Sequence, residues 1–84
     1  MEEYIQVVTT TEKKEDAEKI AEALVKKKLA ACAQTIGPIW SIYWWKGRVE
    51  KAEEWLCLIK SEKSLFCKLE ETIKRFILMK RLKS

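Results

Sequence analysis

Hydrophobic positions along the chain follow two different periods, and their order predicts the pattern strand, helix, strand, strand, helix. Residues 4–10 (Tyr-Ile-Gln-Val-Val-Thr-Thr) are rich in β-branched side chains and predict a first strand. Apolar residues then recur every three or four positions, which predicts an amphipathic helix. Acidic residues at its start and three lysines at its end favour it through the helix dipole. Its apolar stripe consists of Ala17, Ile20, Ala21, Leu24, Val25 and Leu29.

The next two strands are predicted to form one long β-hairpin. Residues 33–45 are apolar and aromatic, Lys46-Gly47 supplies the turn, and residues 48–60 form the return strand. Pro38 cannot donate a hydrogen bond to a sheet, so we expect a bulge or bend there in an edge strand. Residues 55–59 are apolar at every position, which predicts burial of both faces.

The hairpin arms are too long for a domain of this size. Each arm has about a dozen residues, whereas strands usually have about five or six. The whole chain has 84 residues, near the lower end of what can bury a core alone. We therefore expect a neighbouring subunit to cover the hairpin.

A second helix should follow, with Ser61 as its N-cap and an apolar stripe of Phe66, Leu69, Ile73 and Phe76. The predicted fold class is α+β, a ferredoxin-like two-layer sandwich in a single domain of residues 1–84. Its order is βαββα, so the final strand of the βαββαβ plan is missing. The first strand then has a free edge, which we expect a neighbour to fill, or else to cause aggregation.

The charge pattern argues against nucleic-acid binding. The net charge is +4, but residues 77–84 carry Lys80, Arg81 and Lys83 without an acid, so the excess lies mostly in this tail. No apolar run approaches the roughly 20 residues of a membrane span, and residues 1–15 lack the apolar core of a signal peptide. We expect a cytoplasmic protein without membrane contact.

Catalytic residues are not apparent. The chain has no histidine, which excludes a histidine base and the usual Cys/His zinc site. Two glycines form no phosphate-binding loop, and Glu50, Glu53 and Glu54 have basic neighbours typical of a solvated surface. The three cysteines, Cys32, Cys57 and Cys67, lack C-x-x-C spacing and are interpreted as buried small residues. We expect a protein that is not an enzyme.

Two motifs carry a resemblance to a known family. Leu29-Ala30-Ala31-Cys32-Ala33 ends the first helix, and Tyr43-Trp44-Trp45-Lys46-Gly47-Arg48-Val49-Glu50 forms the hairpin tip. Helix, Ala-Ala-Cys segment and aromatic hairpin in this order resemble the CutA family of divalent-cation tolerance proteins over residues 4–76.

The resemblance implies a homotrimer with interlocking hairpins, similar to the PII signalling proteins, that acts in divalent-cation tolerance and binds a small ligand or metal between subunits. Cys32 occupies the family's cysteine position, which implies a role in binding copper, since Cu(I) favours thiolates. The expected interface residues are Tyr43, Trp44, Trp45 and Trp55, because tryptophan and tyrosine are enriched at protein interfaces.

The resemblance stops after Phe76. Family members continue with His-Pro-Tyr-Glu, which opens the last strand, whereas residues 77–84 read Ile-Leu-Met-Lys-Arg-Leu-Lys-Ser. Deleting one base from suitable codons for His-Pro-Tyr-Glu-Ala-Pro-Glu-Ile yields these eight residues. We expect a frameshifted, aberrant tail at 77–84; the alternative is a genuine extension of the second helix.

Two other functions stay open. The aromatic hairpin and basic tail could form a nucleic-acid-binding module, since aromatic side chains on a sheet stack on bases. The chain could also be a purely structural assembly module. Salt-dependent binding of nucleic acid would support the first, and an absence of metal binding would support the second.

Overall fold

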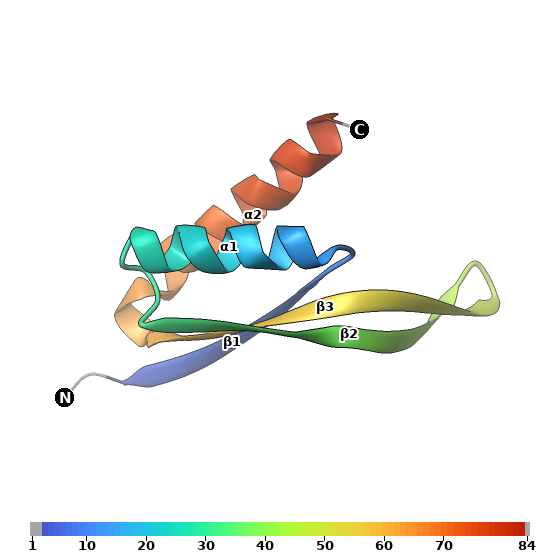
Figure 1. The fold of residues 1–84 in the computed structure, drawn as a ribbon, viewed down its shortest axis with the longest axis horizontal. Helices are drawn as coiled ribbons and strands as arrows, with labels where there is room; N and C mark the ends of the chain where they lie inside the picture. The colour runs from blue at the N-terminus through green and yellow to red at the C-terminus, as the bar shows by residue number, and fades with distance from the viewer. Residues whose placement is uncertain (1–2, 84) are drawn as a thin grey trace.

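The computed structural model describes the backbone of residues 3–83 and the side chains of residues 3–79. The elements are β1 (Tyr4–Thr11), α1 (Lys14–Lys26), β2 (Cys32–Trp45), β3 (Arg48–Glu62) and α2 (Phe66–Lys83), with a 3₁₀ turn at Lys63–Leu65. The strands form one antiparallel sheet in the order β1-β3-β2, and both helices lie on one face of it (Figure 1). The predicted α+β two-layer fold is confirmed.

The core lies between the two helices and one face of the sheet. Of the predicted helical stripe, Ala17, Ile20 and Leu24 are buried, whereas Val25 is 43% exposed. The sheet contributes alternate residues of β3, and α2 contributes two residues one turn apart. The buried core consists of Ala17, Ile20, Leu24, Leu29, Ala30, Cys57, Ile59, Leu69 and Ile73.

The first helix ends earlier than its apolar stripe suggests. α1 stops at Lys26, and Lys28 takes a left-handed backbone conformation with φ of 60°. The Leu29 N–H then donates to the Leu24 carbonyl at 2.9 Å, and the Lys28 N–H donates to the Val25 carbonyl at 3.0 Å. This is a Schellman-type end. Leu29 is therefore buried as part of the α1–β2 loop, not as part of the helix.

Ser61 is not the N-cap of the second helix, so that prediction is wrong. It lies within β3, is 3% exposed, and its Oγ donates a 2.6 Å hydrogen bond to the Leu29 carbonyl. The helix begins five residues later, at Phe66, after the 3₁₀ turn. Ser61 thus ties the end of β3 to the loop that follows α1.

The second helix buries only part of its predicted stripe. Leu69 and Ile73 are buried and Phe76 packs against the core, whereas Phe66 is exposed. The helix continues to Lys83, which agrees with the alternative that the tail extends it. Ile77, Leu78 and Met79 are exposed on this extension. The frameshift remains a prediction, and the side chains of 80–84 lie outside the described ones.

The hairpin has the predicted turn and the predicted bulge. Lys46 and Gly47 both have positive φ, 51° and 75°, as a two-residue type I′ turn requires. The β2–β3 register shifts between Ile36 and Ile39, where β2 holds one extra residue around Pro38. β2 is an edge strand, so the missing donor of Pro38 leaves no gap inside the sheet.

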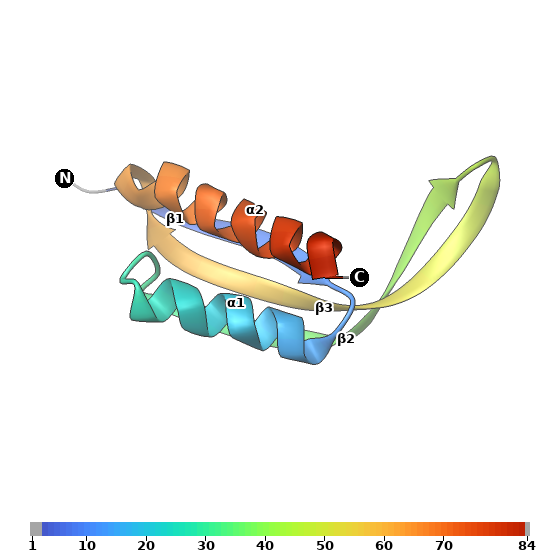
Figure 2. The ribbon, with the colours of Figure 1, turned by 90° about the horizontal axis from the view of Figure 1, so that it is seen from above.

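The distal part of the hairpin projects beyond the helices. Seen from above, α1 and α2 cover one part of the sheet, and the turn between β2 and β3 stands clear of the body (Figure 2). The radius of gyration is 13.9 Å, compared with about 12 Å for a compact chain of this length. The extra length of the molecule is the hairpin.

Replacing Ser61 by alanine should destabilise the fold by about 1–3 kcal/mol, because the buried Leu29 carbonyl loses its partner. Thr72→Ala is the matched control, since its hydroxyl bonds only to the exposed Lys68 carbonyl of its own helix. Urea unfolding followed by circular dichroism measures both at one protein concentration. Equal midpoints for the two variants would show that the Ser61 bond is unimportant.

Replacing Gly37 by alanine should cost about 1–3 kcal/mol through overpacking. A Cβ there lies 2.7 Å from Cε3 and 2.9 Å from Cδ2 of Trp55, and 3.3 Å from the Glu54 carbonyl oxygen. The cost should shrink in a Trp55→Phe background, because the smaller ring leaves more space. Urea unfolding of the four proteins in this cycle gives the coupling, and a cost independent of residue 55 contradicts the prediction.

Candidate functional site

The projecting part of the hairpin exposes apolar side chains on both of its faces. The strand register places Trp40, Ile42 and Trp44 opposite Glu53, Lys51 and Val49, all on one face. Trp40 is 68% exposed, Ile42 65% and Trp44 74%, and Val49 lies beside them. We call Trp40, Ile42, Trp44 and Val49 the hairpin stripe. Apolar surface gathered in this way is typical of a protein–protein contact.

The opposite face of the hairpin carries Tyr43 and Trp45, as strand alternation predicts. Both are exposed, and they pair with Glu50 and Arg48. The Lys46 ammonium lies 5.7 Å from the centroid of a Trp45 ring, within the range of a cation–π contact. Two of the expected interface residues, Tyr43 and Trp45, therefore lie on one face of the hairpin, and Trp44 lies on the other.

Trp55 has a different position from the other three aromatic residues. It is only partly exposed, packs against the core cluster beside the bulge, and has the Lys14 ammonium 5.6 Å from its ring centroid. Its ring faces the backbone of Gly37. Within one chain, Trp55 joins the hairpin to the body, and its role at an interface remains a prediction.

The sheet face away from the helices is only partly covered. The prediction that residues 55–59 are buried on both faces is wrong, because Leu56 and Leu58 point to this open face and are only half-buried. In register, Val8 lies beside Leu58, and Leu56 lies between Thr10 and Ile36. Val8 and Ile36 are about half exposed. The side chains of residues 3–79 leave this apolar surface partly in contact with solvent.

The three cysteines are not brought together. Cys32 is exposed at the start of β2, on the open sheet face opposite Lys60, whereas Cys57 is buried on the helix face. Cys67 is exposed on α2. The interpretation of all three as buried residues is therefore wrong for Cys32 and Cys67. Among residues 3–79, no group of three His, Cys, Asp or Glu side chains could hold a metal.

The local chemistry of the cysteines also differs. Burial raises the pKa of the Cys57 thiol, which disfavours the thiolate needed for metal binding. Cys32 is accessible and lies next to a lysine on the neighbouring strand. One thiol supplies only one ligand, so a metal site at Cys32 requires ligands beyond the side chains of residues 3–79.

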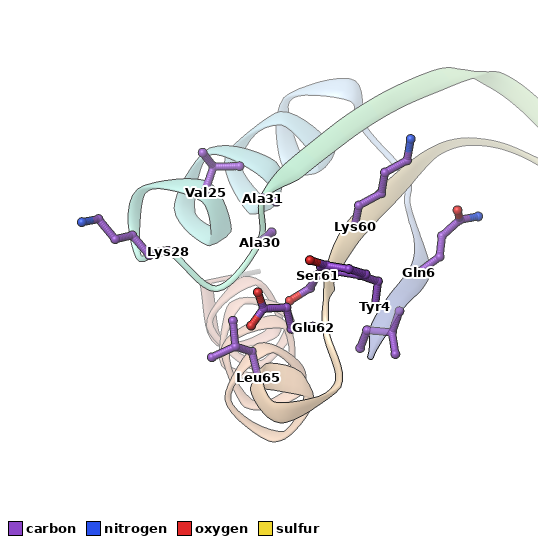
Figure 3. A pocket seen from close by; sticks show the side chains of 11 residues that line it. Tyr4, Gln6, Val25, Lys28, Ala30, Ala31, Lys60, Ser61, Glu62 and Leu65 are labelled. Atoms are coloured by element: carbon purple, nitrogen blue, oxygen red, sulfur yellow. The ribbon is translucent and has the colours of Figure 1, made fainter. Parts of the chain in front are cut away.

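A hollow lies at the end of the sheet where β1 begins and β3 ends. It has a volume of about 730 Å³ and mostly apolar walls, a size within the usual range for small-molecule sites. Figure 3 shows Val25 and Lys28 on one side and Tyr4, Gln6 and Lys60 on the other. Cys32 follows the lining residue Ala31 but does not line the hollow.

A nucleic-acid interface finds little support in the charge distribution. Basic and acidic residues alternate beside the hairpin stripe, with Lys51 and Glu53 as neighbours on the same face. Stacking proteins combine aromatic side chains with a continuous basic track. The basic residues of the tail, Lys80, Arg81 and Lys83, lie outside the described side chains. Neither described helix has the length and apolar character needed to cross a membrane.

Trp40 and Ile42 are the interface candidates that the sequence interpretation missed. Their signal was present, because Trp40, Ile42 and Trp44 alternate with other residues at a period of two. The bulge hides it: residues 32, 34 and 36 face the open side of the sheet, whereas 40, 42 and 44 face the helix side. The extra residue at the bulge therefore changes which residues of β2 face the helices, from the odd-numbered to the even-numbered ones.

The sequence matches a family model and relatives that carry the name CutA. The family model described as CutA1 divalent ion tolerance protein matches residues 5–79. A "Divalent-cation tolerance protein CutA" from Archaeoglobus fulgidus is 42% identical over 60 residues, which cover 71% of this chain and 58% of the relative. A protein of the same name from Thermus thermophilus is 40% identical and covers 88% of this chain and 70% of its own length.

Solved structures agree with the sequence matches. The Cut A1 structure from Thermus thermophilus has a TM-score of 0.79 at 39% identity, covering 90% of this chain and 72% of its own. CutA1 from Ehrlichia chaffeensis has a TM-score of 0.86 at 29% identity, covering 90% and 71%. The chain spans 58% of the Archaeoglobus relative and 40% of a rice relative, "Protein CutA 1, chloroplastic". The chain belongs to the CutA1 divalent ion tolerance protein family.

Proposed function

We propose that this chain acts in divalent-cation tolerance as a non-catalytic, cytoplasmic homotrimer in which neighbouring copies cover the hairpins. The family supplies the biological role, and the hairpin stripe is the observation that supports self-assembly. Three of its members, Trp40, Ile42 and Trp44, are each at least 65% exposed. A chain that leaves such side chains in water has a strong driving force to associate.

The expected size of this driving force is considerable. Full burial of one large apolar side chain contributes about 1.5–3 kcal/mol, and tryptophan is among the residues that dominate measured interface energies. The hairpin presents Trp40, Trp44 and Trp45 together. Several such side chains offset the translational and rotational entropy lost on association, which is at least about 4 kcal/mol.

For the metal, we propose that Cys32 binds copper as Cu(I). Cu(I) prefers thiolate ligands, and Cys32 is an exposed thiol at the family's cysteine position. Because one chain provides one accessible thiol on this face, the remaining ligands come from other copies or from the ligand that carries the ion.

A sensory role similar to that of the PII proteins follows from the same assembly. The hollow beside Tyr4 and Lys60 is open at the sheet end, and a neighbouring copy would close it into a cleft. A small ligand or a metal bound there would contact two copies at once. Its binding would then alter the packing between subunits.

Light scattering after size exclusion tests the assembly. Wild type should have a mass of about 30 kDa or a multiple of it, since one chain is 9.9 kDa. Trp44→Ser should reduce the mass at low concentration, because about 2 kcal/mol or more per chain is lost at such an anchor. Leu78→Ser, an exposed apolar residue of α2, is the matched control and should keep the wild-type mass. A dilute wild-type monomer contradicts the proposal.

Titration with Cu(I) tests the metal role. We expect a thiolate–copper charge-transfer band that Cys32→Ser removes and Cys67→Ser, the other exposed thiol, retains. Under native conditions a thiol reagent should react quickly with Cys32 and Cys67 and slowly with Cys57, whose burial raises its pKa. A silent titration, identical for wild type and Cys32→Ser, would favour a purely structural assembly module.

A further inference from the structure

We propose that the hollow at the end of the sheet binds a small organic anion with an apolar body, such as an aromatic carboxylate. The apolar body lies against the walls, and the carboxylate lies at the rim between Lys28 and Lys60. This ligand class rests on the small-ligand role proposed above. It does not require the trimer, because one chain supplies the lining residues.

The walls of the hollow are mostly apolar, and the loop that follows α1 forms one of them. Val25, Ala30, Ala31 and Leu65 are among the residues that line it. The short side chains of Ala30 and Ala31 leave room for a flat ring. Pockets for small molecules combine such apolar walls with a few polar groups that fix the orientation of the ligand.

Two hydrogen bonds hold this loop in place against β3. The Ala31 N–H donates to the Lys60 carbonyl at 2.9 Å, and the Ser61 hydroxyl donates to the Leu29 carbonyl at 2.6 Å. Ser61 is buried. The wall is therefore formed before a ligand arrives, so binding does not have to order the loop.

The rim carries more positive than negative charge. The charged residues that line the hollow are two lysines and one glutamate, Lys28, Lys60 and Glu62. Figure 3 shows the two lysines on different sides of the hollow, with their ammonium groups at the rim. In the sheet register Lys60 lies between Gln6 and Cys32, so neither neighbouring strand places a carboxylate opposite it.

Both rim lysines are available to a ligand. The adjacent Lys63 lies 3.5 Å from the Glu3 carboxylate, whereas among residues 3–79 neither Lys28 nor Lys60 forms an ion pair. A lysine ammonium sits on a flexible stem and can turn toward an anion at the mouth of the hollow. An anion would meet two opposite charges there and a cation only one, so the rim favours the anion.

Three compounds that share one ring system test the sign of the charge. Naphthoate, naphthalenemethanol and naphthylmethylamine carry a negative, a neutral and a positive group. Their binding to the isotope-labelled chain is followed through the amide NMR signals of Ala30 and Ala31. Naphthoate should bind most tightly and the amine most weakly. Added salt should weaken the binding of naphthoate but not that of the alcohol, because salt screens exposed charges.

Variants of the rim and the wall test the location. Lys28→Asn and Lys60→Gln should each weaken naphthoate about two- to fivefold, as expected for one exposed charge pair, and leave the alcohol unchanged. Asparagine tolerates the left-handed backbone of residue 28. Lys63→Gln is the matched control, because Lys63 does not line the hollow. Ala31→Leu, at an exposed position, should weaken acid and alcohol together by filling the hollow. Circular dichroism confirms folding.

The proposal is overturned if the alcohol or the amine binds as tightly as naphthoate, or if no compound shifts the signals of Ala30 and Ala31. Rim variants that bind naphthoate like wild type overturn it too. Light scattering on the same samples separates this result from the assembly. A monomer that binds naphthoate contradicts only the trimer, and a trimer that does not bind it contradicts only the ligand class.

Discussion

The structure depends on a mismatch in length between its strands and its helices. At about 3.3 Å per residue, the 14 residues of β2 extend about 46 Å, whereas the 13 residues of α1 extend about 20 Å at about 1.5 Å per residue. The first helix therefore covers less than half of the hairpin. The apolar side chains beyond it, Trp40, Ile42 and Trp44 among them, are exposed.

The bulge decides which side chains lie in that uncovered part. Before it, odd-numbered residues of β2 face the helices; after it, even-numbered residues take that side. Gly37 makes the bulge possible beside Trp55, because a larger residue would collide with the indole ring. A local feature of the backbone thus places Trp40, Ile42 and Trp44 on one face and the pair Tyr43 and Trp45 on the other.

Much of the fold could be predicted because its signals are local. The three- and four-residue spacing of apolar side chains predicted α1, the Lys46-Gly47 pair predicted the hairpin turn, and Pro38 predicted the bulge. The errors concern residues whose state depends on distant partners. Ser61 precedes a helical pattern as an N-cap would, but its partner is the Leu29 carbonyl, 32 residues away in sequence. Leu29 continues the helical spacing although a Schellman-type end places it in the loop.

The candidate site was harder to predict for the same reason. Whether Cys32 or Cys57 is accessible depends on the face that the sheet register assigns to each, and no spacing within β2 or β3 determines this. In the sequence, the half-exposed Leu56 and Leu58 belong to a continuous apolar run, a pattern typical of a strand that is buried on both faces. They lie instead on the sheet face away from the helices, which the described side chains cover only in part.

Quenching of tryptophan fluorescence by acrylamide tests the central claim most directly. Three of the four tryptophans, Trp40, Trp44 and Trp45, are exposed in the single chain. If neighbouring copies bury the hairpin, quenching should be weak at high protein concentration and should increase as dilution separates the copies. Quenching that is strong at every concentration, with most of the tryptophan accessible, would contradict the account.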